Sequence, residues 1–133
     1  SEGYDMLLSL YPNEGAGITQ LRALTYKALG LVGSSASDVD NIEAIGEGWV
    51  AEETLAIAVY CAVKYFDNFE KAIIASVNHR GDSDSTGAVT GNILGAVVGY
   101  DAISEFFKTD LELHDVILHV ADDLWRGRTT KFK

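Results

Sequence analysis

Cysteine is almost absent from this chain. The 133 residues include one cysteine, Cys61, so no disulfide can form within them. Because disulfides are typical of secreted small domains, this scarcity favours a reducing compartment, and we expect a cytoplasmic protein. Small apolar residues surround Cys61 in the sequence, which predicts a buried hydrophobic side chain rather than a reactive thiol.

Basic residues and long hydrophobic runs are also scarce. The chain has 10 Lys and Arg against 20 Asp and Glu, a formal net charge of −10. Nucleic acids and anionic membranes attract basic surfaces, so we expect neither as a partner. The longest nearly uncharged apolar run, residues 55–63, is much shorter than the roughly 20 residues that a membrane span needs. No basic and then apolar leader opens the sequence.

The pattern of apolar residues is helical. Alternation typical of strands is nearly absent, whereas apolar residues recur at a spacing of 3.6 residues. The spacing predicts helices over residues 18–32, 39–45, 50–66, 69–77, 85–100 and 111–125. We therefore predict an all-α fold, a compact multi-helix bundle.

Two of these helices carry well-defined apolar stripes. For the 50–66 helix the predicted inward residues are Ala51, Leu55, Ala58, Val59, Ala62 and Phe66. For the last helix they are Leu113, Val116, Ile117, Val120 and Leu124. Trp49 and Trp125 are expected in the core, with a place in a substrate pocket as the alternative for Trp49.

Glycines at strict four-residue spacing mark the helix over residues 85–100. They are Gly87, Gly91, Gly95 and Gly99. Each glycine in a helix interior costs about 1 kcal/mol relative to alanine. Close packing of neighbouring helices against the glycine stripe would recover that cost, so we expect this helix to be central and tightly surrounded.

The most informative segment is residues 78–86 (NHRGDSDST), which places two carboxylates in a turn directly before that helix. Asp82 and Asp84 repel each other, and a helix N-terminus offsets only about 0.3–1 kcal/mol per exposed charge. A divalent cation would offset far more, and oxygen ligands suit Mg²⁺, Ca²⁺ or Mn²⁺ rather than Zn²⁺. Helix capping is the simpler interpretation, but only one residue can be the N-cap.

Three other motifs share these residues. An EF-hand is excluded because Ile93 stands at the twelfth position, where a bidentate Glu is required. The tripeptide of integrin ligands, residues 80–82, needs an exposed loop on a secreted protein. The Asp-x-Asp-x-Thr signature of haloacid-dehalogenase-type phosphatases also matches, with residues 122–123 as the later acidic pair. Its nucleophile must follow a strand, so it stays the lesser alternative.

Residues 78–96 resemble the C-terminal signature of the ADP-ribosylglycohydrolase family, roughly Asn-x-Gly-Gly-Asp-[Ser/Thr]-Asp-[Ser/Thr] followed by a glycine-spaced helix. Residues 46–56 (GEGWVAEETLA) are similar to a second family block, and residues 114–125 to the ending of bacterial members. The resemblance covers about residues 17–126. Arg80 replaces a common Gly, and Ser85 stands where many members have Thr.

The resemblance implies a hydrolase with two Mg²⁺ or Mn²⁺ ions in a central cleft of an all-α fold. Such enzymes cleave the bond between ADP-ribose and a protein side chain or a related acceptor. The implied metal ligands are Asp82, Asp84 and the hydroxyl of Ser85, whereas the catalytic residue is unknown. The implied partners are an ADP-ribosylated protein or a small molecule that contains ADP-ribose.

The family's other metal ligands belong to an N-terminal half, and its Thr-Asp-Asp cluster does not occur here. We expect residues 1–133 to be a single all-α domain or the C-terminal portion of a larger one, inactive alone and completed by the missing half or by a partner chain. The alternative is a non-catalytic helical interaction module, or an orphan half that associates, also with itself, through exposed apolar surface.

The remaining polar residues carry little signal. We expect Glu52 and Glu53 to stabilise a helix start electrostatically, with a place in a cleft as the alternative. His79, His114 and His119 show no spacing typical of a metal site.

Overall fold

The computed structural model describes residues 2–131, which form helices and no strand. The all-α prediction is therefore confirmed. The chain divides into two units, one up to Tyr100 and one from Asp101 onward. Among the described residues no helix is both long enough and apolar enough to cross a membrane.

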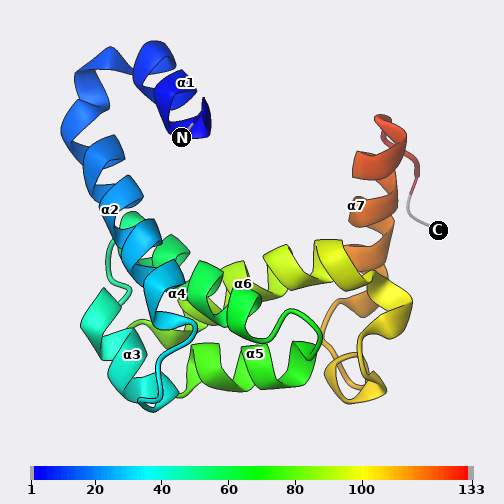
Figure 1. The fold of residues 1–133 in the computed structure, drawn as a ribbon. Helices are drawn as coiled ribbons and strands as arrows, with labels where there is room; N and C mark the ends of the chain where they lie inside the picture. The colour runs from blue at the N-terminus through cyan, green and yellow to red at the C-terminus, as the bar shows by residue number, and fades with distance from the viewer. Residues whose placement is uncertain (1, 132–133) are drawn as a thin grey trace. The chain divides into compact units, whose positions relative to one another are not determined.

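The first unit is built around one central helix. Its elements are α1 (Glu2–Leu10), η1 (Pro12–Glu14), α2 (Gly15–Leu31), α3 (Asp38–Ile45), α4 (Ala51–Lys64), α5 (Phe69–Val77) and α6 (Ser83–Val98). Helix α4 contacts α2, α3, α5 and α6, and α5 lies beside α6 (Figure 1). The main core cluster comprises Ala28, Ile42, Ile45, Ala56, Ile57, Tyr60, Cys61 and Ala75.

Side-chain caps fix the starts of α3 and α5. Ser37 Oγ accepts a hydrogen bond of 3.1 Å from the Asp40 N–H, and Asn68 Oδ1 accepts one of 3.0 Å from the Lys71 N–H. Each bond satisfies an N–H that has no partner inside the helix.

The single apolar stripe predicted for α4 is only partly correct, since of its members Ala58 and Ala62 are buried. Ala51, Leu55 and Phe66 are exposed, whereas Ile57 and Cys61 are fully buried. The reason is that α4 has neighbours on several sides, so its buried surface is much wider than one stripe. Burial raises the pKa of the Cys61 thiol to about 12, with the charge of Asp38 as a smaller cause. Cys61 is thus an inert core side chain, as predicted.

The glycine stripe of α6 is only half covered. A Cβ on Gly87 would lie 2.6 Å from Val77 Cγ1, and one on Gly91 would lie 3.6 Å from Ile73 Cδ1, so α5 packs closely here. A Cβ on Gly95 or Gly99 would meet no described atom within 4 Å. The prediction of a tightly surrounded helix therefore holds for the first half of α6.

This difference in packing predicts that α6 tolerates a methyl group at Gly95 but not at Gly87. We expect Gly95→Ala to raise the free energy of unfolding by about 1 kcal/mol, because alanine is the better helix former and the added methyl has room. Gly87→Ala should gain less or lose stability, since its methyl would displace Val77. Urea denaturation of both variants measures the difference, and equal gains would contradict the close α5–α6 contact.

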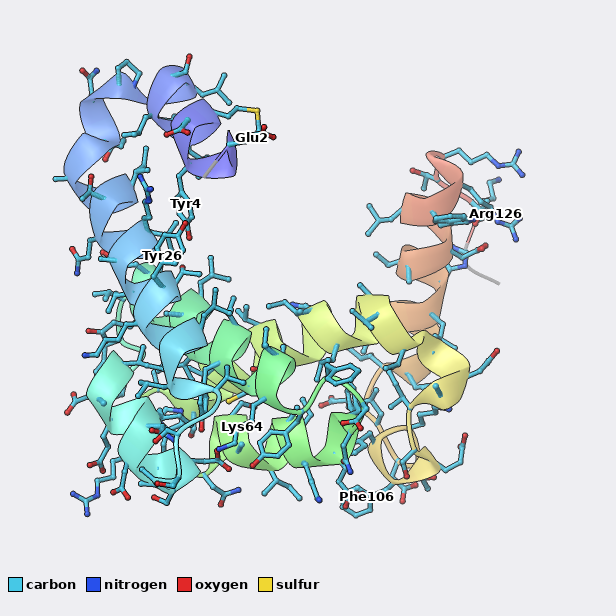
Figure 2. The ribbon with its side chains drawn as sticks, in the orientation of Figure 1. Glu2, Tyr4, Tyr26, Lys64, Phe106 and Arg126 are labelled. Carbon is cyan, nitrogen blue, oxygen red and sulfur yellow. The ribbon has the colours of Figure 1, made fainter. Side chains whose placement is uncertain are left out.

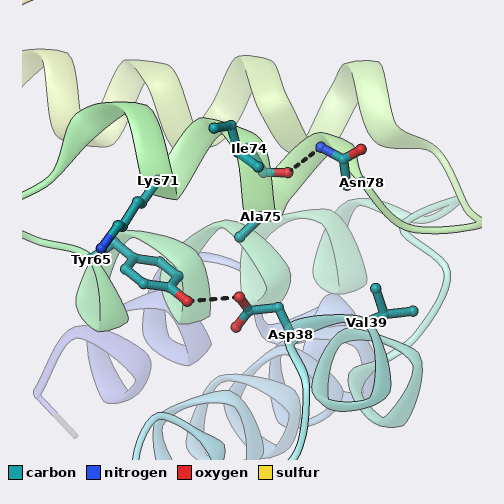
Figure 3. Close-up of a pocket in the computed structure, with 7 residues that line it drawn as sticks. All are labelled: Asp38, Val39, Tyr65, Lys71, Ile74, Ala75 and Asn78. Carbon is teal, nitrogen blue, oxygen red and sulfur yellow. Dashed lines mark hydrogen bonds between the residues drawn. The ribbon is translucent and has the colours of Figure 1, made fainter.

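A polar clamp joins α3 to the C-terminal end of α4. Asp38 Oδ1 accepts hydrogen bonds from Tyr60 (2.6 Å) and Lys64 (2.8 Å). Asp38 Oδ2 accepts one from Tyr65 (2.7 Å), which Figure 3 shows. Asn41 Nδ2 donates to the Tyr60 hydroxyl at 3.1 Å. Burial alone would raise the pKa of Asp38, but these hydrogen bonds outweigh it and hold the pKa below its ordinary value of 3.8.

The clamp predicts a component of stability that acid removes. Because the folded pKa of Asp38 lies below 3.8, the carboxylate stabilises the fold fully above that pH, and the effect is lost as pH falls through the folded pKa. Asp38→Asn should lower the free energy of unfolding at pH 7 by about 2 kcal/mol, because Lys64 loses its ion pair. The two proteins should converge in stability only as pH falls through the folded pKa of Asp38, which lies below 3.8.

Chemical denaturation between pH 2.5 and 7 checks this prediction. Asp67→Asn, which removes an exposed carboxylate, is the matched control and should leave the pH profile of stability unchanged. A constant gap between wild type and Asp38→Asn at every pH would contradict the clamp.

The second unit exposes the apolar side chains of its helix. It contains η3 (Glu105–Phe107) and α7 (His114–Arg126), whereas η2 (Tyr100–Ala102) spans the junction. No residue of α7 is buried, so the predicted inward positions are wrong for this helix. Trp125 is 90 % exposed, which corrects its prediction as a core aromatic, and Phe106 is 81 % exposed. Figure 2 labels Phe106 among the side chains of this unit.

Candidate metal-binding turn

The turn between α5 and α6 holds the predicted acidic residues. Helix α5 ends at Val77, and the Asn78 side chain donates a hydrogen bond of 2.7 Å to the Ile74 carbonyl. Helix α6 begins at Ser83, two residues before its predicted start, with Asp82 as the N-cap. Asp84 and Ser85 therefore lie in the first turn of α6.

The two acidic side chains lie together. The Asp82 side chain makes no capping hydrogen bond, and it lies instead within interaction distance of the Asp84 carboxyl group. This contact is the largest cause of a lowered pKa of Asp84, followed by hydrogen bonds from the backbone N–H groups of Ser85 and of Asp84 itself. Helix capping thus does not explain Asp82, and a pair of oxygen donors stands at the N-terminus of α6.

Ser85 follows the acidic pair directly and is partly buried. Its predicted role as a metal ligand stays a prediction. Within residues 2–131 no group of three or more His, Cys, Asp or Glu side chains comes close enough together to hold a metal ion. A cation at Asp82 and Asp84 would therefore need oxygen donors beyond the acidic side chains of this segment.

A second loop, residues 46–50, docks against the acidic turn by backbone contact. The Asp82 N–H donates a hydrogen bond of 2.8 Å to the Glu47 carbonyl. A Cβ on Gly81 would lie 1.7 Å from that carbonyl oxygen, so this close approach requires glycine. Gly48 has φ +82°, and a Cβ there would lie 3.0 Å from Thr86 Cγ2.

Glu53 holds this second loop in shape. Its Oε2 atom accepts hydrogen bonds from the N–H groups of Glu47 (3.1 Å) and Gly48 (3.0 Å). Thr54 Oγ1 donates a bond of 2.7 Å to the Gly48 carbonyl. The sequence pattern predicted only that Glu53 stabilises a helix start electrostatically, and it did not predict these hydrogen bonds to the loop backbone. The two glycines ahead of Glu53, in Gly46-Glu47-Gly48, were the available signal for a carboxylate that folds back onto loop amides.

The rim of the turn carries an aromatic and a basic side chain. Trp49 is 67 % exposed, so its prediction as a core residue is wrong, and its Nε1–H donates to Glu47 Oε2 at 3.2 Å. Arg80 pairs with Glu43 (Nε to Oε1, 3.3 Å) rather than with the acidic pair. A small pocket of about 270 Å³ lies here, lined by Glu43, Gly46, Glu47, His79, Arg80 and Gly81.

A different pocket, of about 310 Å³, lies beside the α3–α4 clamp (Figure 3). Its lining residues are Asp38, Val39, Tyr65, Lys71, Ile74, Ala75 and Asn78. Both carboxylate oxygens of Asp38 already accept hydrogen bonds from Tyr60, Lys64 and Tyr65. Asp38 therefore serves the fold, and the acidic turn is the better candidate for chemistry.

The haloacid-dehalogenase alternative finds no support. That mechanism requires a strand ahead of Asp82, and α5 occupies the position instead, in a described segment free of strands.

Comparisons with known proteins agree with the geometry. A family model described as ADP-ribosylglycohydrolase matches residues 4–133. An ADP-ribosylarginine hydrolase, Tri1, from Serratia proteamaculans (strain 568) is 37% identical over 73 residues. That alignment covers 55% of this chain and 20% of the relative, so the chain matches about a fifth of the relative's length. No solved structure matches the chain.

The loop–turn contact predicts that Gly81 does not tolerate a side chain. Gly81→Ala should lower the free energy of unfolding by about 1–3 kcal/mol, because a methyl would overlap the Glu47 carbonyl. Gly33→Ala is the matched control, since a Cβ there would meet no described atom within 4 Å. Urea denaturation of both variants decides the matter, and equal stabilities would argue that the loop does not dock as described.

Proposed function

Because the chain belongs to the ADP-ribosylglycohydrolase family, we propose that it is part of a metal-dependent hydrolase that cleaves the bond between ADP-ribose and a protein side chain or related acceptor. The observation that supports this proposal is the pair of carboxylates of Asp82 and Asp84, which lie together at the start of α6. In the described residues the ion pairs of Lys64, Arg80, Lys108 and Arg126 are made with other acidic side chains.

The donor set suits a hard divalent cation. Two carboxylates and the adjacent Ser85 hydroxyl offer oxygen atoms only, which Mg²⁺ and Mn²⁺ prefer. The local charge favours a cation as well, because Arg80 is the one Lys or Arg between Lys71 and Lys108. Arg80 is paired with Glu43, so the charge of the acidic pair remains for an ion to neutralise.

Bound Mg²⁺ or Mn²⁺ would supply Lewis acidity toward the glycosidic bond. In this proposal the residues of the chain position oxygen donors. Asp82 and Asp84 bind the cation from the rigid N-terminus of α6, and the Ser85 hydroxyl completes their contribution. The Glu47 carbonyl accepts a hydrogen bond from the Asp82 N–H, which fixes the position of the backbone that carries the Asp82 carboxylate.

We propose further that the chain supplies one part of a dinuclear site. The acidic pair is too small a set for two ions, and the alignment covers 20% of the curated relative. The other ligands would come from the rest of the family domain or from a partner chain, and residues 1–133 alone would be inactive.

We propose ADP-ribosylated protein, or a small molecule that contains ADP-ribose, as the substrate. ADP-ribosylarginine is the first substrate to assay, since the relative is named for its hydrolysis. We propose a cytoplasmic location, because the one cysteine is buried and no disulfide is available within the chain.

A non-catalytic helical interaction module is the second candidate. It is favoured by α7, on which Ile117, Val120 and Leu124 are each at least half exposed. Such a face is typical of an interaction surface. Loss of hydrolysis without loss of binding to a partner, measured on the same variants, distinguishes this candidate from the hydrolase.

The central prediction is that both carboxylates are needed for metal binding and hydrolysis. The double variant Asp82→Asn/Asp84→Asn should lose Mn²⁺ binding and at least about 100-fold in hydrolysis of ADP-ribosylarginine, since it removes two charged ligands. Binding is measured by titration calorimetry, and hydrolysis on the complete polypeptide that contains residues 1–133.

Asp67→Asn/Asp101→Asn is the matched control, because it removes the same charge from exposed positions that are not part of the acidic turn. This control should keep wild-type metal binding and hydrolysis. Wild-type behaviour of the double variant at the acidic pair would refute the proposed function.

A further inference from the structure

His79 spans the acidic turn with both of its ring nitrogens. The Gly81 N–H donates a hydrogen bond of 3.1 Å to Nδ1, and Nε2 lies 2.9 Å from Thr86 Oγ1. The imidazole therefore joins the backbone next to Asp82 to the first turn of α6. His79 is partly buried, whereas Thr86 is fully buried.

These contacts select one tautomer of the ring. A backbone N–H can only donate, so Nδ1 carries no hydrogen and Nε2 carries it. Nε2–H then donates to the Thr86 hydroxyl, whose own hydrogen goes to a backbone carbonyl. The nearest carbonyl is that of Ser76, at 2.7 Å. Every donor in this chain of hydrogen bonds thus has an acceptor.

The chain of hydrogen bonds ties three segments together. It starts in the turn at Gly81, passes through the side chains of His79 and Thr86, and ends in α5 at Ser76. On the other side, the Asp82 N–H is held by the Glu47 carbonyl at 2.8 Å. The backbone that carries the first carboxylate is therefore fixed from two directions.

We propose that His79 is a positioning residue for the acidic turn: through its Nδ1 and Nε2 contacts it sets the backbone geometry in which Asp82 and Asp84 bind a divalent cation. This inference rests on the proposed function. His79 is not itself a ligand, because both ring nitrogens already have partners within the protein. It acts through the backbone of Gly81 and the hydroxyl of Thr86.

A purely structural role predicts a different outcome. Removal of a partly buried side chain that only packs would lower stability and leave the affinity of the folded protein for cations unchanged. A positioning role predicts a loss of affinity in protein that remains folded. Conservative replacements separate the two contacts. Asn at position 79 offers an acceptor near Nδ1, whereas Gln offers a donor near Nε2.

The experiment is a titration of the complete polypeptide that contains residues 1–133 with Mn²⁺, monitored by ¹H–¹⁵N correlation spectra. Paramagnetic broadening reports cation binding residue by residue, and it detects weak sites. In the wild type we expect selective broadening of the amides of residues 82–86. In His79→Ala we expect the apparent affinity to fall about 10-fold or more, as for other residues that orient metal ligands. His79→Asn and His79→Gln should each recover part of it.

His114→Ala is the matched control, since it removes an imidazole from the second unit, and its Mn²⁺ titration should equal that of the wild type. Thermal unfolding shows which variants are folded. If His79→Ala is not folded, the Mn²⁺ affinities of His79→Asn and His79→Gln decide the result. Wild-type Mn²⁺ affinity in folded His79 variants would overturn the inference alone. Absence of selective broadening in the wild type would instead contradict the proposed metal site, and the inference with it.

Discussion

The hydrogen bond from the Asp82 N–H to the Glu47 carbonyl is the contact on which the candidate site depends. It brings two backbones together, and it exists only because Gly81 has no Cβ to occupy the same space. The loop that provides the accepting carbonyl leads into α4, and the turn that provides the donating N–H leads into α6. One backbone contact therefore aligns the starts of the two helices, which pack against each other along their length.

Polar networks stand at both ends of α4, with the apolar core between them. At the N-terminal end, Glu53 and Thr54 bind the backbone of the preceding loop. At the C-terminal end, Tyr60 and Lys64 bind Asp38 of α3. No buried side-chain nitrogen or oxygen of the described residues lacks a hydrogen-bond partner. Each network fixes the position of a neighbouring segment more specifically than apolar packing could.

The two kinds of acidic site in this protein differ in how their charge is balanced. Asp38 receives hydrogen bonds from a lysine and two tyrosines, so the protein itself satisfies its carboxylate. Asp82 and Asp84 have each other and backbone amides, and the nearest arginine in the sequence pairs with Glu43. The first arrangement stabilises a fold, whereas the second leaves negative charge that an external cation can neutralise.

The sequence by itself determined helices α2 to α7 and the acidic residues 82 and 84, because these depend on local spacing, whereas α1 was not predicted. It could not place the partners of those residues. The full burial of Ile57 and the contact of the Asp82 N–H with the Glu47 carbonyl are decided by segments that lie close only in space. The contacts of Glu53 and His79 join residues near in sequence, but they depend on the course of irregular loops, which the spacing of apolar residues does not report. Periodicity reports which face of a helix is apolar, but tertiary packing decides how many neighbours cover it. The acidic turn was therefore visible in the sequence, whereas its contact with the loop of residues 46–50 was visible only in the structure, because that contact joins segments that are distant in the sequence.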